Sequence, residues 1–144
     1  LEEAGKQYGV YILVSEDTLN CEITDNSGNT KQVFDMVEVR FIDTIAVVGK
    51  SEPVRVYELC AMKGGLTPGE KDLITRFDRG MNHYLNMEWD QAIEEFEKAV
   101  KIERIPDGKT TPSQVYIDRC RGCKESPPVA PGETWDGVFR LTKK

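Results

Sequence analysis

The stretch of residues 45–59 constrains the fold more than any other part of the sequence. An apolar run at residues 45–48 is followed by Gly49, Ser51 and Pro53, and then by residues 54–59, where apolar and polar side chains alternate. Alternation with a period of two is typical of a β-strand, and glycine and proline favour a tight reversal between strands. This stretch therefore predicts a β-hairpin.

The first strand of the hairpin begins well before residue 45. Residues 37–41 also alternate strictly, and the alternation slips at Ile42 and Asp43, which indicates a β-bulge. We therefore expect residues 37–48 and 54–60 to lie side by side as an antiparallel ribbon.

The first 30 residues predict a short mixed segment in front of this ribbon. The pattern indicates the end of a helix closed at Gly9, a buried strand at residues 10–14 and a short helix capped by Ser15. Residues 25–29, Asp-Asn-Ser-Gly-Asn, predict a turn.

After residue 62 the hydrophobic period changes from that of strands to that of helices. Thr67-Pro68-Gly69-Glu70 is a capping box with proline at the first helical position. A second helix is indicated by the apolar stripe of Trp89, Ala92, Ile93, Phe96, Ala99 and Val100, and the same capping pattern at residues 111–114 starts a third. The tail is rich in proline and ends in a short apolar element that begins at Trp135.

The spacing of Ala92, Phe96 and Ala99, with Gly80 in the helix before, is similar to the tetratricopeptide repeat, although Arg76 and Arg79 depart from it. One such repeat cannot bury its apolar face alone, because these arrays need about three repeats. The helices should therefore pack on the α/β part, on the tryptophan tail or on a second chain.

Charge and hydropathy exclude several classes of function. The 144 residues carry a net charge of −6, and no basic stripe with interleaved aromatic residues is present, so nucleic-acid binding is not expected. Residues 1–62 hold five basic and eleven acidic residues, so the acidic excess lies in that part. No apolar run approaches the roughly 20 residues of a membrane span, and we expect a cytoplasmic segment without membrane contact.

The cysteines favour a structural interpretation. Cys60 ends an apolar strand, and Cys120 and Cys123 form a CxxC pair for which the sequence offers no further zinc ligands at a suitable spacing. We expect thiols in a reducing compartment, and leave a redox or metal role of the CxxC pair as the alternative.

Residues 1–59 resemble the C-terminal part of the class III adenylate/guanylate cyclase catalytic domain. The likeness lies in Leu1-Glu2-Glu3, in Lys6-Gln7-Tyr8-Gly9, in the strand that leads to Ser15-Glu16, and in the hairpin GKSEPVRVYEL at residues 49–59. The rest is similar to a tail found on some bacterial members, through Pro106-Asp107-Gly108, Arg119-Cys120, Pro127-Pro128 and residues 135–138.

The resemblance implies that the chain is a fragment. The parent would convert ATP or GTP to the cyclic nucleotide and pyrophosphate, with Mg or Mn held by two aspartates, and would act as a homodimer with the active site at the subunit interface. The metal ligands and the Asn-x-x-x-Arg motif of the family precede the residues that match, so no catalytic and no metal-binding residue is assigned here. The fragment alone is expected to be inactive and to bind no cofactor.

Few residues of the chain itself qualify as site residues. Lys50 stands two residues beyond the position, here Val48, where many family members carry a phosphate-contacting lysine, so Lys50 is the candidate for substrate binding. Tyr84, Trp89 and Trp135 are candidates for a partner surface, against the plainer interpretation that aromatic residues at helical spacing form core.

These patterns together predict an α+β fold. Residues 1–62 would form a partial cyclase-type, ferredoxin-like antiparallel sheet with helices, residues 63–66 a linker, and residues 67–144 a helical tetratricopeptide-like extension. The alternative function is a non-catalytic interaction or regulatory module. A longer protein is expected, because the sequence does not begin with methionine.

Overall fold

The predicted hairpin forms the centre of the fold. The computed structural model describes residues 2–46, 49, 51–104 and 110–140. In it β4 (Val37–Ala46) pairs with β5 (Val54–Met62) in antiparallel register. The expected ribbon is confirmed up to Ala46, while residues 47 and 48 lie outside the described residues. The register shifts between Phe41 and Asp43, which confirms the predicted bulge.

Two short strands complete the sheet in the order β1-β5-β4-β6. β1 (Leu13–Ser15) pairs with β5 in antiparallel fashion, whereas β6 (Phe139–Arg140) runs parallel to β4. The pairs of β1, β5 and β4 are antiparallel, as predicted for residues 1–62. The sheet as a whole is mixed, because β6 from the predicted helical part adds a parallel strand that was not expected. The tail returns to the sheet after the last helix, and its Phe139 ring lies 4.1 Å from the Arg119 guanidinium of that helix.

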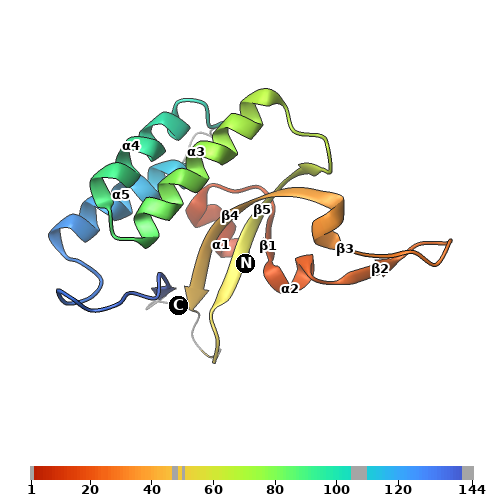
Figure 1. Ribbon diagram of the computed structural model, residues 1–144, viewed down its shortest axis with the longest axis horizontal. Coiled ribbons are helices and arrows are strands. Elements are labelled where there is room, and N and C mark those ends of the chain that lie inside the picture. Colours follow the sequence, from red (N-terminus) through yellow and green to blue (C-terminus); the bar gives the residue numbers. More distant parts are fainter. Residues whose placement is uncertain (1, 47–48, 50, 105–109, 141–144) are drawn as a thin grey trace.

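The N-terminal elements follow the predicted order. The strand predicted as buried at residues 10–14 is shorter, because only β1 is paired, and it is half-buried, with Tyr11 and Ile12 before it exposed. The first helix, α1 (Glu2–Tyr8), ends at Gly9, whose φ is 75°, and α2 (Glu16–Leu19) is capped by Ser15, which accepts a hydrogen bond from the Thr18 N–H. The turn at residues 25–29 joins β2 (Glu22–Thr24) and β3 (Thr30–Gln32), two strands that the sequence did not predict, and the 3-10 helix η1 (Val33–Met36) leads into β4. Figure 1 shows the β2–β3 hairpin projecting away from the helices.

The three predicted helices are present with the predicted caps. They are α3 (Pro68–Leu85), α4 (Trp89–Val100) and α5 (Pro112–Glu125). Thr67 accepts a hydrogen bond from the Glu70 N–H while the Glu70 carboxylate accepts one from the Thr67 N–H, which completes the capping box. Thr111 caps α5 in the same way by accepting from the Gln114 N–H.

Close packing joins α3 and α4 as an antiparallel pair. Tyr84 meets Trp89 next to the turn, and Phe77 meets Phe96 farther along both helices. Gly80 permits this approach, because a Cβ there would lie 2.6 Å from the Phe96 ring. Any side chain at residue 80 would therefore push the two helices apart.

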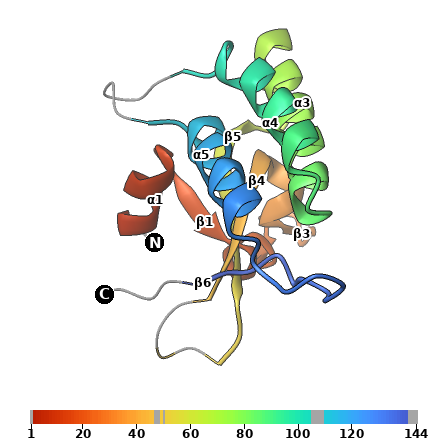
Figure 2. The same cartoon turned by 90° about the vertical axis from the view of Figure 1, so that its left-hand side faces the viewer.

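The helices cover one face of the sheet, and the two parts share a core (Figures 1 and 2). One buried cluster contains Ile42, Ile45 and Val56 from the ribbon together with side chains of α3, α4 and α5. Because successive strand residues point to opposite faces, Tyr57 belongs to a second, smaller cluster with Leu19 and Val37. The expected packing of the helices on the α/β part is thus what the structure shows.

A chain that ends at Gly65 should not fold. Without α3–α5, the side chains of Ile42, Ile45 and Val56, each at most 2% exposed, would face water. Each loses about 1.5–3 kcal/mol of burial energy, and the sum is comparable to the total stability of a domain, ~5–15 kcal/mol. We expect no cooperative thermal transition for residues 1–65 by circular dichroism, whereas the 144-residue chain shows one. A cooperative transition of the short chain would contradict the shared core.

Candidate functional site

A buried arginine in β4 links the sheet to the helices. The Arg40 side chain is 3% exposed, and its Nε and Nη2 donate to Glu58 Oε1 on β5 at 2.9 and 2.7 Å. Its Nη1 donates to Glu103, which follows α4, and the guanidinium lies 4.7 Å from the centre of the Phe77 ring. Glu103 also accepts from the Ser113 N–H at the start of α5, at 3.1 Å. One cation therefore ties two strands to all three helices.

Arg40 stays charged in this setting. Burial by itself lowers the pKa of Arg40, but the carboxylates of Glu58 and Glu103 outweigh burial and the pKa lies above its ordinary value. The Arg40 guanidinium is therefore a fixed positive charge paired with Glu58 and Glu103. It does not exchange a proton near neutral pH.

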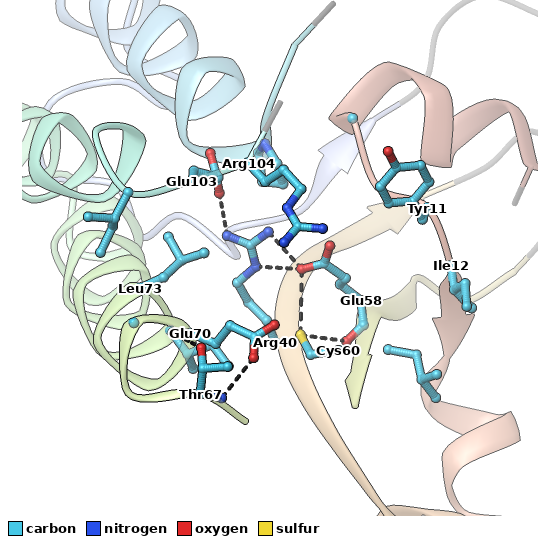
Figure 3. A pocket seen from close by; sticks show the side chains of 16 residues that line it. Tyr11, Ile12, Arg40, Glu58, Cys60, Thr67, Glu70, Leu73, Glu103 and Arg104 are labelled. Carbon is cyan, nitrogen blue, oxygen red and sulfur yellow. Dashed lines mark hydrogen bonds and ion pairs between the residues drawn. The ribbon is translucent and has the colours of Figure 1, made fainter. Parts of the chain in front are cut away.

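A pocket of about 490 Å³ lies beside this network, between α3, β5 and the residues before β1 (Figure 3). Its polar lining comes from Arg40, Glu58, Glu70, Glu103 and Arg104, with Cys60 and Thr67 between them. Its apolar lining consists of Ile12, Leu59, Leu73, Ile74, Ile102 and Pro112. The pocket therefore combines an apolar wall with a few charged groups, as small-molecule sites do.

A second buried ion pair fastens α5 to the bulge of β4. Arg119 Nη1 donates to Asp43 Oδ2 at 2.9 Å, and the side chains of Arg119 and Asp43 are 15% and 1% exposed. The Tyr8 hydroxyl donates to the same carboxylate oxygen, and the Thr44 N–H donates to the other at 2.8 Å. The bulge that the sequence predicted at Asp43 thus turns a carboxylate into the core, where three donors satisfy it.

Tyrosine rings enclose this ion pair. The Arg119 guanidinium lies 4.7 Å from the Tyr116 ring centre, and the Tyr116 hydroxyl donates to the Ile42 carbonyl at 2.6 Å. Burial raises the pKa of Tyr8, Tyr84 and Tyr116, and for Tyr84 it reaches about 12. Burial lowers the pKa of Arg119, but Tyr116 and Asp43 outweigh it, so the pKa lies above its usual range. Because the Asp43 carboxylate is 1% exposed and accepts from three donors, this cluster holds the fold together.

Arg119→Met should destabilise the chain strongly. It leaves the Asp43 carboxylate charged and buried without its cation, which costs roughly 3–5 kcal/mol. Arg121→Met is the matched control, since Arg121 lies on the same helix, is 60% exposed and makes only 3.8 Å surface contacts; we expect a change of at most ~0.5 kcal/mol there. Urea unfolding followed by tryptophan fluorescence measures both, and equal losses in the two variants would contradict the assignment.

The structure brings the three predicted partner-surface residues together. Tyr84 contacts Trp89 and Trp135 at ring-centre distances of 5.8 and 5.1 Å, and the two tryptophans lie 5.7 Å apart. Tyr84 is only 1% exposed, while both tryptophans are half-buried. The accessible aromatic surface at this place is formed by Trp89 and Trp135, and Tyr84 is buried below them. Binding of a partner to this surface stays a prediction.

The predicted substrate residue, Lys50, lies outside the described residues, as do Val48 and the turn Pro106-Asp107-Gly108. Its phosphate contact stays a prediction. The charged pairs at Arg40 and Asp43 were not predicted as a site. The sequence does show charged residues within the strand, at Arg40 and Asp43. Charged residues in a strand normally indicate a solvent-facing side, so their burial could not be predicted without knowing that helices cover that face.

The cysteines are free thiols. Burial raises the pKa of Cys120 to about 12 and also raises the pKa of Cys123, so neither is a thiolate near neutral pH. Among the described residues, no group of three His, Cys, Asp or Glu side chains is placed to hold a metal ion.

Comparison with known proteins gives one distant similarity. The chain is 26% identical over 127 residues to the adenylate cyclase, terminal-differentiation specific, of Dictyostelium discoideum, a match that covers 83% of this chain and 5% of that protein. No family model matches the chain, and no solved structure matches it. The similarity indicates a distant relationship to an adenylate cyclase, and the matched protein is from a eukaryote.

Within the described ranges, no helix has the length and apolar character needed to cross a bilayer.

Proposed function

We propose that this chain is the C-terminal part of the catalytic region of a class III nucleotidyl cyclase, joined to a helical, tetratricopeptide-like extension. The observation that carries the proposal is the similarity to an adenylate cyclase, which extends over 83% of the chain. The antiparallel β4–β5 hairpin supports it, because residues 49–59 of this hairpin are one of the segments that resemble the cyclase family.

The parent protein would form a cyclic 3′,5′-nucleotide and pyrophosphate from ATP or GTP. Two magnesium or manganese ions would activate the ribose hydroxyl and stabilise the charge of the triphosphate. Those ions would be held by residues outside this chain, and the parent would act as a homodimer in the cytoplasm, with Lys50 near the phosphates. The chain described here would then contribute a rigid wall of the catalytic region.

A comparison of two lengths of polypeptide tests this proposal. The chain extended by the residues that precede it in its gene should form cyclic AMP or cyclic GMP with Mg or Mn, while the 144-residue chain alone should form neither. The same extended protein with Val56→Asp, which puts a charge at a fully buried site of β5, should lose activity, whereas Glu94→Gln on the exposed face of α4 should keep it. Activity of the 144-residue chain, or none in the extended protein, would contradict the proposal.

The alternative is a non-catalytic interaction or regulatory module. The observation that favours it is the half-buried pair of Trp89 and Trp135, which leaves aromatic surface next to the α3–α4 turn. Replacing both tryptophans with leucine in the extended protein distinguishes the two proposed functions. If the chain is only part of the catalytic region, the rate of cyclic nucleotide formation should stay unchanged. If it is a regulatory module, the response of that rate to partner proteins should change.

A further inference from the structure

The pocket between α3 and β5 carries an unbalanced negative charge. Three acidic residues, Glu58, Glu70 and Glu103, and two basic residues, Arg40 and Arg104, line it, which leaves a net charge of −1. Arg40 is already in contact with both Glu58 and Glu103, so it has little attraction left for an anion. An anionic ligand would also approach the Glu70 carboxylate, whose charge Arg104 offsets only in part.

Glu58 offers an accessible acceptor to this pocket. Its Oε1 takes both hydrogen bonds from Arg40, while Oε2 accepts no hydrogen bond from any described residue. The side chain is 20% exposed, and Figure 3 shows its carboxylate at the pocket between Arg40 and Arg104. The Cys60 thiol also donates to Oε1, at 3.6 Å. Since a carboxylate has about four acceptor positions, Oε2 can bind a further donor without releasing Arg40.

Glu70 adds a second negative charge on the opposite side. It lies in the first turn of α3, where the Thr67 N–H donates to its Oε1 at 2.8 Å. This hydrogen bond lowers the pKa of Glu70, so the carboxylate stays ionised at neutral pH. The pocket thus places two carboxylates on different elements around one cavity.

Apolar side chains gather at the same place. Six large hydrophobic residues are exposed in the described chain, and three of them, Tyr11, Ile12 and Ile102, line this pocket with exposures of 69, 50 and 45%. Leu73 and Ile74 of α3 form the half-buried wall between them. Single exposed apolar residues are ordinary, but their convergence on one cavity with a free acceptor is typical of a ligand site.

We propose that this pocket binds a small organic cation, with an ammonium or amidinium group at Glu58 and an apolar body against Ile12, Leu73 and Ile102. The volume of about 490 Å³ suits such a ligand, because small-molecule sites range over roughly 300–1,000 Å³. The inference is independent of the proposed cyclase function, since it uses only the contacts and charges of this cavity.

Methyl NMR of the 144-residue chain with benzamidine tests the proposal. The methyl signals of Ile12, Leu73 and Ile102 should shift saturably, while that of Ile23, exposed on β2 away from the pocket, should not. Benzoate and benzyl alcohol have the same ring without the cation and should give no saturable shift at equal concentration. Saturation by benzoate, or none by benzamidine, would overturn the proposal.

Two variants that should change the affinity for benzamidine in opposite directions separate an effect on binding from a loss of folding. Glu58→Gln should weaken benzamidine binding about tenfold, because it removes a charge-assisted hydrogen bond. Arg104→Ala should strengthen binding about threefold, because it removes a nearby positive charge at the exposed rim. Glu94→Gln removes an acidic side chain outside the pocket and should leave binding unchanged. If Glu58→Gln does not fold, benzamidine binding by Arg104→Ala is the test of the proposal. Weaker binding by that variant than by the unchanged chain would overturn it.

Discussion

The contact between Arg119 and Asp43 is the interaction on which the rest of the structure depends. A buried carboxylate at the bulge of β4 is stable only with a cation and hydrogen-bond donors around it. α5 supplies the cation and α1 supplies the Tyr8 hydroxyl, so the ribbon, the N-terminal helix and the C-terminal helix must all be in place together. The Phe139 ring then packs on the same guanidinium and brings β6 to the sheet.

Arg40, three residues before Asp43 on β4, makes a similar buried network. Its two carboxylates lie on β5 and after α4, so it fixes the distance between the sheet and the helices, while Phe77 covers its face. Because both partners of such a buried pair are needed, the helical half is joined to the ribbon by charges as well as by apolar burial. The pocket beside Glu58 lies next to this network, between α3 and β5.

Sequence patterns predicted the local structure well and the long-range contacts poorly. The hairpin, its bulge at Asp43 and the caps at Thr67 and Thr111 follow from short-range rules, and all are present. The parallel pair of β6 with β4 was missed because nothing local in Phe139 and Arg140 shows which strand they will meet. The pairing of Asp43 with Arg119 spans 76 residues, and no periodicity reports it.

Hydrogen exchange measured residue by residue tests most directly whether sheet and helices are one cooperative unit. Slowly exchanging amides of β4 and β5 and those of α3 and α5 should give the same opening free energy, equal to the free energy of global unfolding. Two separate units would instead show full protection of the amides of α3 and α5 while those of β4 and β5 open at a much lower free energy, or the reverse, and this result would contradict a single cooperative core.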